Sequence, residues 1–320
     1  MTVKFGLFVP QGWKMDLVGI DDPVEQYEAM TAVAKAADAG PWDSVWVYDH
    51  FHTVPKPTLE TTFEAWTVSA TLARDTERVR IGQMVGCNGY RNPALYAKIA
   101  STVDVASHGR LNAGIGAGWY RHEWRAYGYG FPEVPERMRM FREAVQIIDK
   151  MWTEDYLTFD GEFYTINRPI NEPKSARPGH KIPLWIGGGG EKITLKLVAQ
   201  YGDACNVGRD PDVCRHKLDV LKRHCETVGR DYDEIIKSTS FNVFPIDKGD
   251  DPQRATEKAL GPMDREKFDN DNLIGTEDEI ADKVEASLEA GADYVIFYVP
   301  GVAYDLDLVT RVEQVAKRFA

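Results

Sequence analysis

The sequence contains no run of about 18 apolar residues, so it predicts no membrane-spanning helix. It is also short of positive charge, because 38 Lys and Arg against 50 Asp and Glu give a formal net charge of −12. This balance argues against nonspecific binding to nucleic acid or to an anionic membrane, but it leaves room for a small anionic ligand in a local basic pocket. The first apolar segment is broken by Gly6, Pro10 and Gly12 and has no signal-peptide cleavage site, so we expect a cytoplasmic protein.

Cysteine is scarce as well, with four residues and no CxxC spacing. The segment CRHKLDVLKRHC, residues 214–225, places two cysteines near His216 and His224 and raises the question of a metal site. The spacing favours another interpretation, in which Cys214, Leu218, Leu221 and Cys225 form one apolar stripe of a helix. The two histidines lie off that stripe, so we predict no metal site.

What the sequence does contain is a regular alternation of apolar strands and amphipathic helices. Glycines bound many of the short apolar runs, which is typical of a parallel sheet buried on both faces. Eight such strand–helix units favour a closed (β/α)8 TIM barrel over a doubly wound sheet. The strands are predicted at 3–9, 44–49, 78–85, 110–116, 183–187, 203–208, 235–244 and 293–299, and the helices at 23–39, 63–74, 93–107, 136–152, 192–201, 212–228, 276–290 and 306–319.

Two segments interrupt the alternation, near 153–182 and 245–275. The first contains YLTFDGEFYTI, a predicted β-hairpin with Asp160-Gly161 at its turn. The second is charged and irregular, with a possible short helix, and is either a lid or a solvated surface loop. No Gly/Ser linker divides the chain, so we predict a single barrel domain over residues 1–320.

Barrel geometry places functional groups at the carboxyl ends of the strands. The second strand ends in YDHFHT, which puts Asp49, His50 and His52 at that position. Histidine titrates near neutral pH, and an adjacent carboxylate can fix its tautomer. We therefore predict that His50 is a catalytic acid or base and that Asp49 orients it. Arg91, after the third strand, either meets an anion or pairs with a loop carbonyl.

The segment PLWIGGGGEKITLKLV joins the fifth strand directly to a helix through four glycines, 187–190. Exposed backbone amides and a helix N-terminus favour an anion such as phosphate. A tight βα turn alone would need only one glycine. No GxxxxGK[ST] P-loop is present, and Lys192 is positioned to add charge.

The fourth strand ends in GIGAGWYRHEWRAYG, residues 114–128. Its glycines resemble a dinucleotide fingerprint only weakly, because the following residues form no obvious helix. We interpret GIGAG as a strand end and WYRHEW as a loop that closes over a ligand. In that loop Trp119 and Tyr120 are expected to flank a ring, while Arg121, His122 and Glu123 bind charge or transfer protons.

FGLFVPQG, WVYDHF, GYRNPALYAK, SHGRLNAGIGAGW and PLWIGGGGEKITLKLVAQYGDACN together resemble the luciferase-like flavin and deazaflavin oxidoreductase superfamily. The similarity covers nearly the whole chain and is closest to the branch that uses coenzyme F420. It implies a ring-shaped coenzyme at the carboxyl ends of the strands and a non-prolyl cis peptide in the third strand, here Met84–Val85. It also implies phosphate binding at Gly188, Gly189 and Gly190.

The coenzyme is further expected to contact Asp49, Gly116, Ala117, Gly118 and Glu191, the last through its amide. Sugar-phosphate dehydrogenases of this superfamily carry a glutamate after the fourth-strand glycines, where this chain has Trp119, so that acid role does not carry over. We expect Trp13, Trp119 and Tyr120 to shape the substrate pocket.

The resemblance implies hydride transfer between F420 and an alcohol, activated alkene, imine or nitro compound, in a protein that forms homodimers. Two alternatives stay open. One is an FMN-dependent monooxygenase served by a separate reductase, since the two coenzymes share ring shape and phosphate. The other is a non-catalytic deazaflavin-binding protein, against which the presence of Asp49 and His50 argues.

Overall fold

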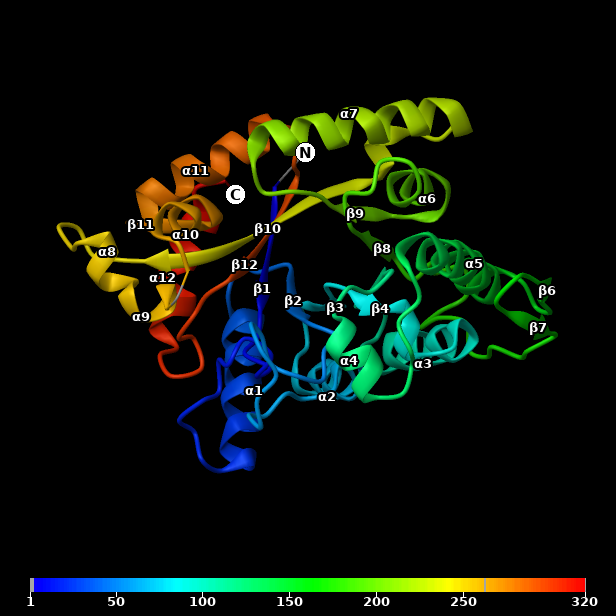
Figure 1. The fold of residues 1–320 in the computed structure, drawn as a ribbon, viewed down its shortest axis with the longest axis horizontal. Helices are drawn as coiled ribbons and strands as arrows, with labels where there is room; N and C mark the ends of the chain where they lie inside the picture. Colours follow the sequence, from blue (N-terminus) through cyan, green and yellow to red (C-terminus); the bar gives the residue numbers. More distant parts are fainter. Residues whose placement is uncertain (1–2, 262, 320) are drawn as a thin grey trace.

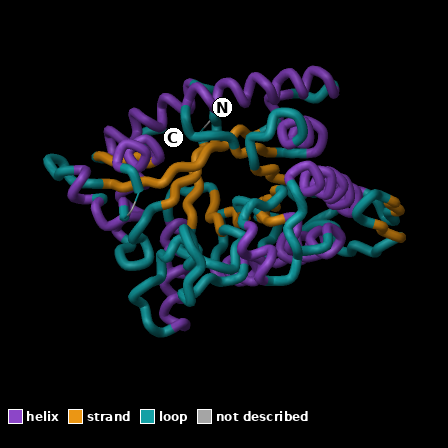
Figure 2. Tube along the Cα trace, in the orientation of Figure 1, coloured by secondary structure: helices purple, strands orange, loops and turns teal. Residues whose placement is uncertain are grey.

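The computed structural model describes residues 3–261 and 263–319, within which eight parallel strands close into a barrel. Strand β1 pairs with β2 on one side and β12 on the other, and the pairing of β9 with β10 completes the ring. Figure 2 shows the strands around the centre and the helices outside them. The strands are β1 (Lys4–Phe8), β2 (Ser44–Val47), β3 (Arg80–Gln83), β5 (Leu111–Gly116), β8 (Leu184–Gly187), β9 (Ala204–Asn206), β10 (Ile236–Pro245) and β12 (Tyr294–Tyr298).

The predicted (β/α)8 barrel is therefore confirmed, with element ends displaced by a few residues. Strands such as β2 are buried along their whole length because side chains on one face fill the barrel and those on the other pack under helices. The helices that follow the eight strands are α1 (Pro23–Ala39), α2 (Ala65–Asp75), α3 (Pro93–Ala106), α5 (Val134–Thr153), α6 (Thr194–Tyr201), α7 (Pro211–Val228), α11 (Glu277–Glu289) and α12 (Asp307–Lys317) (Figure 1).

Several helix ends follow their local sequence signals. Asp22 accepts hydrogen bonds from the amides of the first turn of α1, and Pro23 occupies the first turn itself. Thr276 and Glu279 form a reciprocal capping box at the start of α11, whose first turn is acidic. None of the helices in the described ranges is long and apolar enough to cross a membrane.

Aromatic side chains fill the barrel interior. Trp46 lies at a ring-centroid distance of 4.6 Å from Trp185, and Tyr294 packs against both. Phe8 and Tyr298 belong to the same buried cluster. Because these rings pack the barrel interior, we expect a ligand site at the carboxyl ends of the strands and in the loops that follow them.

The third strand is interrupted, which corrects the continuous strand predicted at 78–85. Strand β3 ends at Gln83, a cis peptide joins Met84 to Val85, and the short β4 (Gly86–Cys87) then pairs with β5. The cis bond is at the predicted position. A 3-10 turn, η1 (Asn88–Tyr90), follows before α3 begins.

The two predicted insertions lie on opposite sides of the barrel in Figure 1. The first holds the antiparallel pair β6 (Thr158–Asp160) and β7 (Thr165–Asn167), whose connection is the four residues 161–164 rather than a two-residue turn. The second holds α8 (Pro252–Ala255), α9 (Glu257–Leu260), α10 (Arg265–Asp271) and β11 (Asn272–Gly275), the last paired with β10. Thus 245–275 has more regular structure than predicted.

The segment after β5 is also more regular than its sequence indicates. Residues predicted as a loop form the helix α4 (Arg121–Ala126), which packs over the barrel mouth through the buried Glu123 and Trp124. A second 3-10 turn, η2 (Tyr232–Glu234), precedes β10. On α7 the predicted stripe is confirmed, because Cys214, Leu218, Leu221 and Cys225 are all buried.

Candidate active site

His50 lies just beyond β2, between aromatic side chains from two loops, those that follow β1 and β5. Its ring stacks on that of Trp13, with centroids 4.2 Å apart and planes 3° apart. Trp119 and Tyr120 present their rings at 5.6 and 5.9 Å from the other directions. The structure thus brings together the predicted catalytic histidine and the three predicted pocket residues, although Trp119 is 60% exposed.

The carboxylate that holds His50 is Glu123, not Asp49, which corrects the predicted pairing. Nδ1 of His50 lies 2.8 Å from Oε2 of Glu123. The same carboxylate accepts hydrogen bonds from Tyr90 and from the amides of Phe51 and His52. Burial alone would raise the pKa of the Glu123 carboxyl, but these donors, led by His50, lower it overall.

The ionised state of Glu123 determines the tautomer of His50. A carboxylate can only accept hydrogen bonds, so Nδ1 of His50 has to carry a proton. The neutral ring then has its lone pair on Nε2. A base oriented in this way through its second nitrogen is suited to proton transfer at Nε2.

Asp49 instead anchors the loop that follows the third strand. Its Oδ2 accepts hydrogen bonds from Arg91 at 2.6 Å and from the Cys87 amide at 2.8 Å, and its Oδ1 accepts from Arg91 at 3.0 Å. Arg91 also pairs with Glu64, the residue that caps α2. Burial opposes the charge of Arg91, yet the two carboxylates outweigh it and raise the pKa of the guanidinium. Arg91 therefore pairs with anions, but these are two carboxylates of the protein itself and not a ligand or a loop carbonyl.

The position of Val85, in the cis peptide, explains why glycine is needed at two neighbouring strand ends. A Cβ atom at Gly116 or at Gly187 would lie 2.8 Å from a methyl group of Val85. Larger residues would push Val85 out of its position between the two strand ends. Ala117 is partly buried and packs against the core beside them, and Gly118 continues the chain toward α4.

The glycine loop leads from β8 toward α6, which begins at Thr194, two residues later than predicted. Gly188 has φ +112°, a conformation that favours glycine. No side chain caps the first turn of α6, so its amides and the loop amides are free of a competing side-chain acceptor within the described residues. A phosphate fits such a cradle.

Glu191 turns its side chain away from this loop toward α7. Its carboxylate lies 2.5 Å from Nζ of Lys217 and 3.1 Å from Nε2 of His216, while its carbonyl oxygen lies 2.8 Å from Nε2 of His224. The two histidines of the 214–225 segment thus fasten the glycine loop to α7. Lys192 is exposed.

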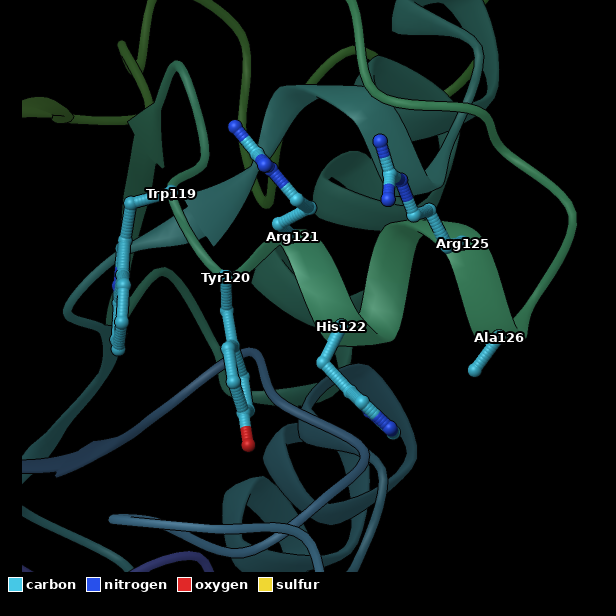
Figure 3. Close-up of a pocket in the computed structure, with 6 residues that line it drawn as sticks. All are labelled: Trp119, Tyr120, Arg121, His122, Arg125 and Ala126. Carbon is cyan, nitrogen blue, oxygen red and sulfur yellow. The ribbon is translucent and has the colours of Figure 1, made fainter.

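Two cavities open at the carboxyl end of the barrel and share Trp119. The outer one, of about 710 Å³, follows α4 and is lined by Trp119, Tyr120, Arg121, His122, Arg125 and Ala126. Figure 3 shows the two aromatic rings side by side, with both arginines on the opposite side from Tyr120 and His122. The hydroxyl of Tyr120 donates to the carbonyl of Thr53, which fixes the ring.

The inner cavity, of about 440 Å³, lies at the ends of β1, β2, β3, β9, β10 and β12. Its walls include Trp13, Trp119 and Met84, which were expected at the site. They also include residues that the sequence did not single out for chemistry, namely Lys14, Tyr48, Arg209, Asn242 and Tyr298. Pockets of this volume accommodate ring-sized ligands.

Comparison with known proteins identifies the lineage. The chain is 26% identical over 318 residues to an F420-dependent glucose-6-phosphate dehydrogenase of Gordonia bronchialis, covering 89% of this chain and 91% of that protein. Its fold matches an F420-dependent secondary alcohol dehydrogenase solved with an F420–acetone adduct (TM-score 0.77, 20% identity, 98% and 99% coverage). It also matches the oxygenating constituent of 3,6-diketocamphane monooxygenase from Pseudomonas putida, solved with FMN (TM-score 0.79, 16% identity, 100% and 98% coverage).

The family model for the luciferase-like monooxygenases matches residues 3–271, which span the barrel from β1 to α10. The match extends over far more than half of the chain and includes every segment on which the predicted resemblance rests. The chain therefore belongs to the luciferase-like monooxygenase family.

Proposed function

We propose that this protein is an oxidoreductase that transfers a hydride between coenzyme F420 and a small organic substrate. The observation that carries the proposal is the position of His50, held by the ionised Glu123 among Trp13, Trp119 and Tyr120 at the barrel mouth. Support for F420 comes from relatives named as F420-dependent dehydrogenases along nearly the full length of the chain.

The residues present fit a flavin-like coenzyme with a phosphate. The loop Gly188–Gly190 and the uncapped start of α6 would hold the phosphate, and the Met84–Val85 bond would lie against the ring. Gly116 and Gly187 keep Val85 in place for that contact. Asp49 would act indirectly, because it accepts hydrogen bonds from Cys87 and Arg91 and so holds the loop that follows the Met84–Val85 bond.

When bound, the coenzyme would supply the hydride acceptor or donor. For an alcohol, Nε2 of His50 would take the hydroxyl proton as the hydride leaves carbon, and Glu123 would stabilise the resulting imidazolium. In the reverse direction the imidazolium would return that proton to a carbonyl oxygen. The same proton donor would serve an activated alkene, an imine or a nitro compound. Trp13 and Trp119 would hold the substrate beside His50.

A binding titration tests the coenzyme. We expect F420 to bind with a dissociation constant in the micromolar range or lower and FMN to bind more weakly, measured by coenzyme fluorescence. Gly189→Asp places a negative charge in the phosphate loop and is expected to weaken binding by about tenfold or more. Lys35→Gln, at an exposed position of α1, makes the net charge more negative by the same one unit and serves as the control. Preference for FMN would instead favour the two-component monooxygenase.

A further inference from the structure

Two basic side chains, Lys14 and Arg209, line the inner cavity, and its described lining includes no carboxylate. Lys14 enters from the loop after β1 and Arg209 from the loop after β9. Nζ of Lys14 donates to Oδ1 of Asn242 at 2.9 Å and lies 3.7 Å from the centroid of Tyr298. Arg209 donates to the carbonyl oxygen of Asp271. Among the described residues, neither cation forms a salt bridge with a carboxylate.

Asp16 is the nearest candidate for a counter-ion, but its oxygens are already used. Oδ1 accepts the amide of Gly12 at 2.6 Å, and Oδ2 accepts the hydroxyl of Tyr298 at 3.3 Å. Its carboxyl is itself buried, which raises its pKa to about 6. Asp16 therefore reduces the free-energy cost of burying the ammonium of Lys14, but it forms no salt bridge with that ammonium.

The other walls of the cavity are suited to recognise a flat or compact organic molecule. Trp13, Phe8 and Trp119 supply apolar surface, and Asn206 and Ser240 supply polar groups. The indole N–H of Trp13 has no acceptor among the residues described. A cavity that combines aromatic rings with two basic side chains and an N–H donor selects a ligand with an apolar body and an anionic end.

We propose that Lys14, together with Arg209, binds an anionic group of the substrate, a carboxylate or a phosphate, and so selects small organic anions as the substrates of this enzyme. The inference rests on the proposed function, because it places this group in the cavity next to His50. A buried cation without a partner is unfavourable until an anion arrives, and two cations that converge on one anion bind it through charge-assisted hydrogen bonds.

The protonation state of Lys14 gives the proposal a pH signature. Burial lowers the pKa of its ammonium to about 7, with Arg209 acting in the same direction and Asp16 opposing it. The other titratable groups facing it are the hydroxyls of Tyr48 and Tyr298, both with pKa values raised by burial and therefore neutral. Lys14 thus holds its proton below pH 7 and loses it above, so anion affinity should fall as the pH rises.

The test uses the purified full chain saturated with F420 and two probes of equal size, benzoate and the uncharged benzamide, in calorimetric titrations. Phenyl phosphate serves as a third probe that separates phosphate from carboxylate recognition. We expect both anions to bind at pH 6 at least about tenfold more tightly than benzamide, and benzoate affinity to fall by about tenfold at pH 8.5. Lys14→Met should abolish this preference and Arg209→Met should weaken it, whereas Lys35→Met, on the outside of α1, should leave it intact.

Three outcomes would overturn the proposal. Benzoate and benzamide could bind equally, Lys14→Met could retain the preference while remaining folded by circular dichroism, or Lys14→Met could weaken F420 binding by tenfold and leave benzoate affinity unchanged, which would assign Lys14 to the coenzyme. Failure of F420 to bind to the wild-type chain is a separate result. Benzoate binding in that case would remove the proposed function but keep an anion site in the cavity.

Discussion

Two groups of buried charges lie within the same barrel mouth, and they differ in how fully their hydrogen bonds and charges are satisfied. Beneath His50, the carboxylates of Glu123 and Asp49 have donors on both oxygens. In the inner cavity, Lys14 and Arg209 are held by an amide and a carbonyl oxygen and face each other's charge. A network of charges whose hydrogen bonds are all satisfied fixes the geometry of its side chains. Charges without a partner of opposite sign instead favour the binding of a ligand that carries the opposite charge. The first group therefore positions the catalytic base and the second selects what it acts on.

The largest expected effect follows from removing the base itself. His50→Ala should reduce turnover by about 10²- to 10⁴-fold, because proton transfer at Nε2 is lost. F420 affinity, followed by fluorescence, should change much less, since the phosphate loop is untouched. Turnover is measured on a substrate found by screening alcohols and electron-poor alkenes that carry a carboxylate. Full activity in this variant would show that another group transfers the proton. The network around Glu123 would then not serve to position a catalytic base.

The satisfied network also makes a prediction about stability. Asp49→Asn keeps the shape of the side chain but leaves Arg91 buried with Glu64 alone, so we expect the free energy of unfolding to fall by about 3 kcal/mol. Urea denaturation at pH 7 measures this change. The exposed pair of Asp282 and Arg318, 2.8 Å apart, provides the control, because Asp282→Asn should change stability by less than about 0.5 kcal/mol. Equal effects of the two substitutions would show that Asp49 is not a structural anchor.

Asp49 also illustrates what sequence can and cannot reveal. The strand and helix order was predictable because each element has its own periodicity, and barrel geometry then placed His50, Trp13 and Trp119 at one end. The pairing of Asp49 with Arg91 could not be predicted, because Asp49 is adjacent to His50 in the sequence and this adjacency indicated the wrong partner. Neighbouring side chains at a strand end point in different directions, so Asp49 turns toward the loop of the third strand.

The roles of Glu123 and of the cavity cations, Lys14 and Arg209, were even harder to predict from the sequence. Glu123 reaches His50 across 73 positions because α4 folds over the barrel mouth, and its sequence signal was only a charged residue in an apparently irregular segment. Lys14 and Arg209 lie on two loops whose conformations carry no periodic pattern, and Asn242 meets them from β10. Proximity between loops depends on tertiary packing, which single-sequence patterns do not encode.

A smaller effect is expected from changing the charge of Glu123. Glu123→Gln removes the requirement for a proton on Nδ1 of His50, so part of the population adopts the other tautomer, and turnover should fall by about a hundredfold. Stability at pH 7 should fall by about 1–3 kcal/mol. The folded-state pKa of Glu123 is below its ordinary value of 4.5, so this stabilisation is present above that pH and is lost as the pH falls through the folded-state pKa.

The matched control for this substitution is Glu162→Gln on the β6–β7 connection. Glu162 pairs with Arg139 at 3.1 Å, but both side chains are about half exposed. Neither turnover nor the acid limb of the stability curve should change in this variant. A pH-independent difference between Glu123→Gln and the wild type would mean that Glu123 acts through shape, not through charge.

The smallest effect tests the unsatisfied group directly, in the absence of any ligand. Lys14→Met should raise the free energy of unfolding at pH 6 by about 1 kcal/mol, because it removes a largely buried ammonium that contacts no carboxylate among the described residues. The pKa of Lys14 is lowered by burial from 10.5 to about 7, so the unfolded chain holds this proton more tightly than the folded one. The penalty is complete below pH 7 and fades as the pH rises toward 10.5, which means that the advantage of the variant should shrink over that range. Denaturant midpoints at pH 6, 8 and 9.5, with Lys35→Met as the control, measure it. A wild-type chain that is the more stable of the two at pH 6 would show that protein groups already neutralise Lys14, and the contrast with the Asp49 and Glu123 carboxylates would disappear.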